Sequence, residues 1–208
     1  MPLKFPVPIV YPITSGKASP PDILRLVRAA VDAEVPLFQI REKSLSARAL
    51  YELVVGAVSI TRASKTRLLV NDRVDVARAA GADGVHLTAH SLPAEVVRSA
   101  CGPDFLIGVS THSREEAQAA RAGGADFVVF GPVFETESKR LFGPPQGLDQ
   151  LREVTSEMGE FPVFAIGGIT LEKIPACLSA GARGIAGITL FGKDVNRIVR
   201  NIRAQYIG

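Results

Sequence analysis

GADGVHL at residues 81–87, GADFVVF at 124–130 and GARGIAG at 181–187 are three copies of one short pattern. Each copy begins with Gly-Ala and continues into a mainly apolar stretch. A Gly at this point suits the left-handed residue that ends a helix, and the apolar stretch suits a buried strand. Each copy therefore predicts a short turn from a helix into a strand, the connection that recurs in alternating α/β folds.

The same alternation extends along the chain, because short apolar runs are separated by longer segments of helical periodicity. Pro21 near the start of one such segment and Ser46 at the start of another suit helix N-termini. We predict eight strands, at residues 7–14, 37–42, 67–72, 84–87, 105–111, 127–134, 162–169 and 184–190.

Eight strand-helix units predict one domain over residues 1–208 that folds as a (β/α)₈ TIM barrel. A doubly wound open sheet also alternates strands and helices, but eight near-equal units would make it unusually wide. The barrel is therefore the expected α/β architecture.

The composition excludes several classes of partner. The net charge is only +3, and the basic residues are scattered rather than gathered into a stripe that would bind nucleic acid. No apolar run is long enough to span a membrane, and four prolines interrupt the first fourteen residues, where a signal peptide would lie. Cys101 and Cys177 stand apart from each other and from any metal-binding pattern. We expect a cytoplasmic protein with small-molecule partners, and the sequence leaves its oligomeric state open.

Polar residues follow the predicted strands at the end of a barrel where active sites lie. Along the second strand, alternation puts Gln39, Arg41 and Lys43 on one side, where two cations would suit a phosphate or diphosphate. A charged surface loop is the alternative. After the third strand come Asn71 and Asp72, and Asp72 is either a helix N-cap or a Mg²⁺ ligand.

The later strand ends add proton-transfer and phosphate-binding candidates. Ser110 and His112 end the fifth strand, where a His can move a proton near neutral pH. Ser113 and Glu116 have the spacing of a helix capping box. Glycines and hydroxyls after strands six to eight suit a closing arm and a cradle of main-chain N–H groups around a phosphate, at Thr136, Ser138, Lys139, Gly167, Gly168, Ile188 and Thr189.

Together these segments resemble the thiamine phosphate synthase family, which includes thiazole tautomerases. The motifs YPIT, QIREK, NDR, GADGVHL, GVSTHS, FGPVFETESK and AIGGI occur in family order over nearly the whole chain. In the synthases, an aminopyrimidine diphosphate loses diphosphate and a thiazole phosphate nitrogen captures the remaining cation. The resemblance implies that the pyrimidine side is bound by Gln39, Arg41, Lys43, Asn71, Ser110 and Lys139. It implies that the thiazole phosphate is bound by Thr136, Ser138, Gly168, Ile188 and Thr189.

One segment departs from the synthase pattern. Ser91 stands where the synthases have a second Mg²⁺-binding aspartate, so Asp72 is the only carboxylate that matches the metal site. The tautomerases shift a proton within a carboxylated thiazole phosphate and use a His that His112 matches. We therefore expect a thiazole tautomerase, which needs no cofactor, with His112, Lys139 and Ser110 as catalytic residues. The alternatives are a thiamine phosphate synthase that uses Mg²⁺ and pyrimidine diphosphate, a non-catalytic thiamine phosphate-binding protein and, more weakly, a phospho-sugar isomerase.

Overall fold

A computed structural model of the chain describes residues 7–136, 144–192 and 194–206. Eight parallel strands form one sheet in the order β1-β8-β7-β6-β5-β4-β3-β2. The strands are β1 (Ile9–Pro12), β2 (Leu37–Ile40), β3 (Arg67–Asn71), β4 (Gly84–Leu87), β5 (Leu106–Thr111), β6 (Phe127–Phe130), β7 (Val163–Ala165) and β8 (Gly184–Gly187).

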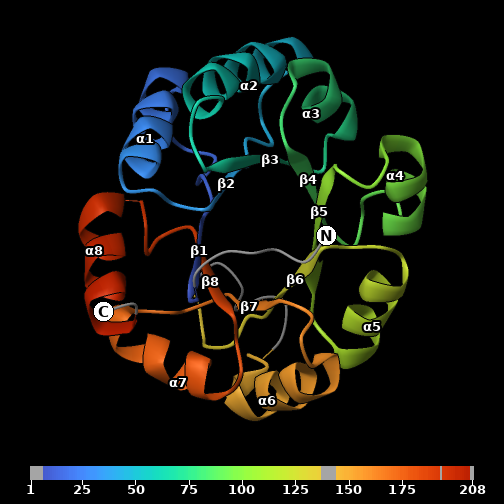
Figure 1. The fold of residues 1–208 in the computed structure, drawn as a ribbon, viewed down its shortest axis with the longest axis vertical. Coiled ribbons are helices and arrows are strands. Elements are labelled where there is room, and N and C mark those ends of the chain that lie inside the picture. Colours follow the sequence, from blue (N-terminus) through green and yellow to red (C-terminus); the bar gives the residue numbers. More distant parts are fainter. Residues whose placement is uncertain (1–6, 137–143, 193, 207–208) are drawn as a thin grey trace.

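A ring of helices surrounds the strands, as Figure 1 shows in a view along the barrel. The helices are α1 (Pro20–Asp32), α2 (Ala47–Thr61), α3 (Val74–Ala80), α4 (Ala94–Cys101), α5 (Arg114–Ala122), α6 (Gly147–Met158), the 3₁₀ turn η2 (Leu171–Lys173), α7 (Ile174–Ser179) and α8 (Val195–Tyr206). The predicted caps are present: a proline opens α1, and Ser46 Oγ accepts the N–H of Ala49 at the start of α2.

The sheet closes on itself where β1 meets β2. Ile13 bridges Gln39 in parallel, and the Thr14 N–H donates to the Gln39 carbonyl at 3.0 Å. The Arg41 N–H then donates to Thr14 Oγ1 at 2.8 Å. This bridge brings the two ends of the sheet together into a nearly closed barrel, so the TIM-barrel prediction is confirmed and the open doubly wound sheet is excluded.

Alternation along each strand divides the apolar residues into two cores. Residues that point outward pack beneath the helices, in the larger cluster. Residues that point inward fill the barrel with a smaller cluster that includes Tyr11, Phe127 and Phe164. The barrel interior is therefore packed with side chains, and ligands have to bind above it, at its carboxyl end.

The repeated Gly-Ala pattern forms the turns that the sequence predicts, with a further role for its aspartate. The first Gly of each copy has a positive φ, at Gly81, Gly124 and Gly181. In two copies the aspartate accepts a main-chain N–H from the preceding strand: Asp83 Oδ2 from Leu68 and Asp126 Oδ2 from Ile107, at 2.8 and 2.7 Å. Each carboxylate thus ties adjacent strands together at the amino end of the barrel.

Several predicted strands are too long at their carboxyl ends. The second strand ends at Ile40 instead of residue 42, the sixth at Phe130 instead of 134, the seventh at Ala165 instead of 169, and the eighth at Gly187 instead of 190. Beyond these ends the chain leaves the regular ladder and forms the loops at the barrel mouth, although Val133 and Phe134 still donate main-chain hydrogen bonds to Ile166 and Gly167.

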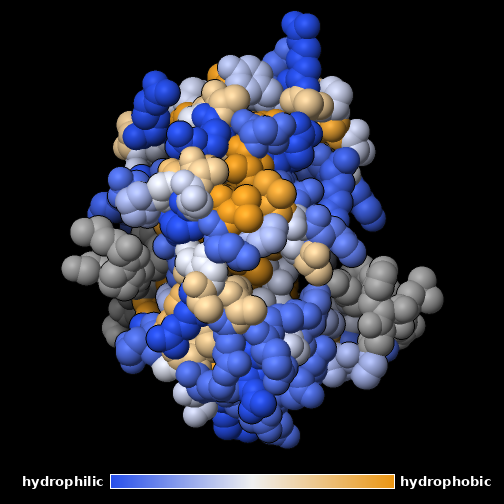
Figure 2. Space-filling model, turned by 90° about the vertical axis from the view of Figure 1, so that its right-hand side faces the viewer, coloured by the Kyte–Doolittle hydropathy of each residue, from blue (hydrophilic) through white to orange (hydrophobic). Residues whose placement is uncertain are grey.

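On the side of the molecule shown in Figure 2, the surface is mainly polar, with one apolar patch near its centre. Among the residues that the structure describes, no helix has both the length and the apolar character needed to cross a bilayer.

Candidate active site

A cleft of about 240 Å³ opens at the carboxyl ends of β2, β3 and β4. It is lined by charged and polar residues from three loops: Glu42, Lys43, Asn71, Asp72, Arg73, Thr88 and His90, with Leu45 and Leu50. The lining combines two cations, Lys43 and Arg73, with two carboxylates, Glu42 and Asp72, and Lys43 is the cation of this set that suits the predicted anionic ligand.

The alternation predicted for residues 39–43 holds only in part. Gln39 faces the barrel interior and is 1% exposed, whereas Arg41 and Lys43 lie beyond the end of β2. Past the strand, Glu42 and Lys43 both line the cleft, and Glu42 Oε1 accepts the Gly16 N–H at 3.3 Å. The reason is that the chain leaves the sheet after Ile40 and no longer follows a period of two.

Gln39 and Asn71 form a buried amide pair at the floor of the barrel mouth. Gln39 Nε2 donates to Asn71 Oδ1 at 3.2 Å across the β2–β3 ladder. Gln39 Oε1 is buried and has no hydrogen-bond partner among the residues that the structure describes. An orphaned buried acceptor is costly, so this oxygen is suited to accept a hydrogen bond from a bound ligand.

Asp72 does not cap a helix, because α3 begins after Arg73 and has no side-chain cap. Its backbone lies in the left-handed region with φ of 63°, a conformation that Asp adopts more readily than most non-glycine residues. Ser91 Oγ donates to Asp72 Oδ1 at 2.5 Å, and the Thr88 N–H donates to Ser91 Oγ at 2.8 Å. Thr88 and Ser91 therefore hold the Asp72 carboxylate at the rim of the cleft.

The donor set fits a Mg²⁺ ion that is shared with a substrate. The described residues contain no group of three or more His, Cys, Asp or Glu side chains that could hold a metal ion by themselves. Mg²⁺, however, is commonly bound through one or two carboxylates together with phosphate oxygens and water. Asp72 supplies one such carboxylate in the lining of the cleft.

Ser110 lies at the end of β5, and its partner is a residue whose role sequence reasoning left unassigned. His86 Nε2 lies 2.9 Å from Ser110 Oγ, and His86 Nδ1 lies 3.3 Å from the Tyr11 hydroxyl. Burial lowers the pKa of His86 to about 3, so its ring is neutral. An inward-facing histidine in an apolar strand usually belongs to the core, and only the distance to Ser110 reveals the connection to the site.

His112 follows β5 and is held by two hydrogen bonds. Its Nδ1 donates to the Gly131 carbonyl at 2.5 Å, and its main-chain N–H donates to Glu116 Oε2 at 2.6 Å. Ser113 Oγ accepts the Glu116 N–H at the start of α5, so one half of the predicted capping box forms. The other half is displaced by one residue, because Glu116 reaches His112 rather than the Ser113 N–H. Among the residues that the structure describes, none is a hydrogen-bond partner of His112 Nε2, so this nitrogen is the one that suits the predicted proton transfer.

The loops after β6 and β7 pack main chain against main chain. The N–H groups of Val133 and Phe134 donate to the Ile166 and Gly167 carbonyls at 2.8 and 3.0 Å. Gly168 has φ of 62°, and a Cβ there would lie 2.5 Å from the Glu135 carbonyl oxygen. The N–H groups of Gly168 and Thr189 donate no hydrogen bond to another residue within the described ranges. They are therefore suited to an anion such as a phosphate.

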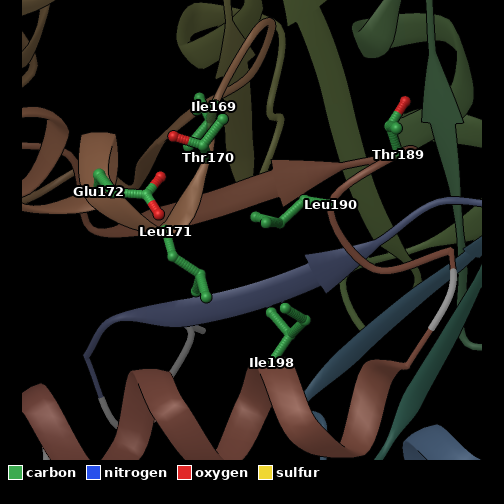
Figure 3. A pocket seen from close by; sticks show the side chains of 7 residues that line it. All are labelled: Ile169, Thr170, Leu171, Glu172, Thr189, Leu190 and Ile198. Carbon is green, nitrogen blue, oxygen red and sulfur yellow. The ribbon is translucent and has the colours of Figure 1, made fainter.

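Thr189 also borders a second cavity, of about 380 Å³, between these loops and α8 (Figure 3). Leu171, Leu190 and Ile198 point into this cavity, and Glu172 lies at its edge. An apolar lining beside a carboxylate does not suit a phosphate. The glycine-rich loop ends therefore match the predicted phosphate cradle better than this cavity does. Ser138 and Lys139, predicted for the closing arm, lie outside the described residues.

Comparison with known proteins identifies relatives over most of the chain. The thiamine monophosphate synthase model matches residues 10–191. A putative thiamine-phosphate synthase of Geobacter sulfurreducens is 50% identical over 83% of this chain and 81% of that protein. The thiamine-phosphate synthase of Roseiflexus castenholzii is 41% identical over 90% of this chain and 83% of its own length. These relatives do not support the expected tautomerase and agree better with the alternative, a synthase.

Solved structures agree with this match to the thiamine-phosphate synthases. A thiamine phosphate pyrophosphorylase from Pyrococcus furiosus superposes with a TM-score of 0.82 at 33% identity, over 97% of this chain and 98% of the other. A 3-hexulose-6-phosphate synthase has a TM-score of 0.70 at 20% identity, over 93% of this chain and 98% of the other, which reflects the shared barrel alone. The barrel and its polar strand ends agree with these matches. The chain therefore belongs to the thiamine monophosphate synthase family, whose enzymes act in thiamine biosynthesis.

Proposed function

We propose that this enzyme is a thiamine phosphate synthase, which joins an aminopyrimidine diphosphate to a thiazole phosphate and releases diphosphate. The observation that carries the proposal is the buried Oε1 of Gln39, which has no partner among the described residues and belongs to a side chain hydrogen-bonded to Asn71 in the cleft lining. An aminopyrimidine has an exocyclic amine that donates to such an oxygen, whereas a thiazole ring has no N–H group. The site thus suits the synthase substrate better than the tautomerase substrate.

The diphosphate fits the neighbouring cleft, where Lys43 supplies positive charge. Arg73 also lines the cleft, and its guanidinium donates to both carboxylate oxygens of Asp75. Asp72 is the residue that would hold a Mg²⁺ ion, which would neutralise charge on the departing diphosphate when it is bound. The methylene carbon–oxygen bond of the pyrimidine substrate breaks, the diphosphate leaves with the bonding electrons, and the thiazole nitrogen forms the new bond to carbon.

The thiazole phosphate fits the loops after β7 and β8. The main-chain N–H groups of Gly168 and Thr189 supply donors for the phosphate, and the left-handed glycine brings the main chain close to it. Two anions bound at opposite sides of the barrel mouth would leave the pyrimidine carbon and the thiazole nitrogen between them, where Ser110 ends β5. Such positioning supplies much of the catalytic effect in this kind of transfer.

The experiment is a paired assay on the purified protein. In one arm, the protein is incubated with hydroxymethylpyrimidine diphosphate, thiazole phosphate and Mg²⁺, and thiamine phosphate and diphosphate are measured. In the other, it is incubated with a carboxythiazole phosphate, and NMR follows its isomerisation. We expect product only in the first arm. Isomerisation without thiamine phosphate formation would overturn the proposal in favour of the tautomerase, and binding without turnover in either arm would favour the binding protein.

A further inference from the structure

Three polar groups form a line through the barrel interior toward its mouth. Tyr11 on β1 is fully buried, His86 on β4 is 3% exposed, and Ser110 at the end of β5 is partly exposed. The Tyr11 hydroxyl lies 3.3 Å from His86 Nδ1, and His86 Nε2 lies 2.9 Å from Ser110 Oγ. The line thus connects a phenol deep in the core to a hydroxyl at the candidate active site.

Aromatic packing fixes the position of the first two groups. The Tyr11 ring packs edge-on against Phe127 and Phe164, with ring centroids 5.4 and 6.2 Å apart. The His86 ring packs against Phe127 at 6.1 Å. Gly108 makes room for this arrangement, because a Cβ there would lie 2.8 Å from His86 Nδ1. Neither ring can turn away without disturbing the packed interior.

The directions of these hydrogen bonds follow from burial. Burial keeps His86 neutral, so only one of its ring nitrogens carries a hydrogen, and burial also raises the pKa of Tyr11, which stays protonated. Among the described residues, His86 Nδ1 is the only acceptor that the structure places beside the Tyr11 hydroxyl. If Nδ1 carried the hydrogen, the phenol would lose its acceptor in an apolar surrounding, which disfavours that tautomer by about tenfold or more.

We propose that Tyr11 holds His86 in the Nε2-protonated tautomer, so that His86 donates to Ser110 and the Ser110 hydroxyl keeps its own hydrogen for the bound substrate. Tyr11 and His86 are then positioning residues, and Ser110 is the group that contacts an acceptor atom of the substrate. With the opposite tautomer, the Ser110 hydrogen would be directed at His86 Nε2 and lost to the substrate. That Ser110 meets a substrate rests on the proposed function, whereas the tautomer does not.

The tautomer is measured without any substrate. Long-range ¹H–¹⁵N NMR of protein labelled at its three histidines distinguishes a protonated from an unprotonated ring nitrogen, and His86→Gln identifies the His86 signals. We expect His86 to be protonated at Nε2 in the wild type and to become a mixture of tautomers in Tyr11→Phe. Tyr51→Phe, on the exposed side of α2, is the matched control and should leave the His86 signals unchanged. A wild-type His86 protonated at Nδ1 would overturn the proposal.

A double-mutant cycle then separates positioning from structural support. Tyr11→Phe should lower kcat by about three- to tenfold, the effect of one misdirected hydrogen bond, with little change in KM. In a Ser110→Ala background, Tyr11→Phe should lower kcat no further, because the hydroxyl that it orients is absent. An equal loss in both backgrounds would overturn the positioning role. If the synthase assay itself gives no product, the NMR result still stands, so failure of the proposed function is distinguishable from failure of this inference.

Discussion

Asp72 combines a left-handed backbone with a carboxylate that a neighbouring hydroxyl holds in position. Its backbone has a φ of 63°, its side chain lines the cleft, and its Oδ1 accepts a hydrogen bond from the Ser91 hydroxyl. A hydroxyl orients the carboxylate but adds no negative charge, so an ion at this point depends more heavily on phosphate oxygens than it would between two carboxylates. The Mg²⁺ requirement should therefore be sensitive to residue 91.

The first prediction concerns that position. Ser91→Asp places a second carboxylate within reach of Asp72, and the two negative charges attract Mg²⁺ while repelling each other without it. We expect the Mg²⁺ concentration for half-maximal synthase activity to fall on the order of tenfold. The measurement is initial rate against Mg²⁺ at saturating substrates.

Ser91→Ala is the control for this prediction, because it removes the hydrogen bond without adding charge. It should raise the Mg²⁺ requirement by about two- to tenfold, since the carboxylate is no longer held in place. An unchanged Mg²⁺ requirement in both variants would show that the ion does not bind beside Asp72.

At the scale of elements, the sequence predicted well what a single strand or helix determines by itself. All eight strands were located, and the glycines of the repeated pattern have the expected left-handed conformation. Contacts between neighbouring strands were missed. The aspartates at 83 and 126 accept main-chain N–H groups of the strand beside them, and no local pattern reveals a partner about 15 to 20 residues away.

In the candidate site, too, the sequence predicted some residues and missed a contact between strands. Gln39 and Asn71 were predicted separately and lie within hydrogen-bonding distance, because adjacent strand ends meet at the barrel mouth. His86 was left without a role, since the sequence contains nothing that places it beside Ser110. The roles of all these residues in binding and catalysis stay predictions until the assays above are made.

The second prediction contrasts two glycines in different elements. A Cβ at Gly108 on β5 would lie 2.3 Å from Phe127 Cζ, inside the packed barrel, so Gly108→Ala should lower the free energy of unfolding by about 1–3 kcal/mol. A Cβ at Gly56 in the middle of α2 would meet only Leu24, at 3.4 Å. Gly56→Ala should therefore raise the free energy of unfolding by about 0.5–1 kcal/mol.

Urea unfolding of both variants and the wild type tests the contrast. Gly56→Ala is also the control for introducing a methyl group, because it makes the same chemical change at a site with room for it. Equal effects on stability would show that the barrel interior tolerates a side chain at residue 108 and is packed less tightly than the structure indicates.

In the whole molecule, contacts that stabilise the fold gather at the amino end of the barrel, and the candidate active site lies at the carboxyl end. At the amino end, Arg98 donates to the Gly102, Phe105 and Gly124 carbonyls and to Asp126, a network that joins α4 to the next two strands. At the carboxyl end lie Asp72, with its left-handed backbone, and the Gln39 oxygen, which has no partner in the part of the chain that the structure describes. The line from Tyr11 to Ser110 crosses the interior between these ends. Because His86 in this line is buried, a change in its protonation should affect the stability of the whole protein.

The third prediction follows from the pKa of His86, which burial lowers from 6.5 to about 3. Below pH 6.5 the unfolded chain takes up a proton at this residue that the folded protein does not. The stability contributed by the neutral ring is therefore fully present above about pH 6.5 and is lost as the pH falls toward 3. The slope from this group reaches about 1.4 kcal/mol per pH unit.

Carboxylates titrate in the lower part of the same range, so the effect has to be measured as a difference between proteins. Urea unfolding at intervals from pH 7 to pH 4 should show that His86→Gln loses stability less steeply than the wild type. His90→Gln, at an exposed position, is the matched control and should run parallel to the wild type. If the His86→Gln curve also ran parallel to the wild type, the ring would take up its proton in the folded state, and the neutral imidazole that Tyr11 is proposed to orient would be lost as the pH falls.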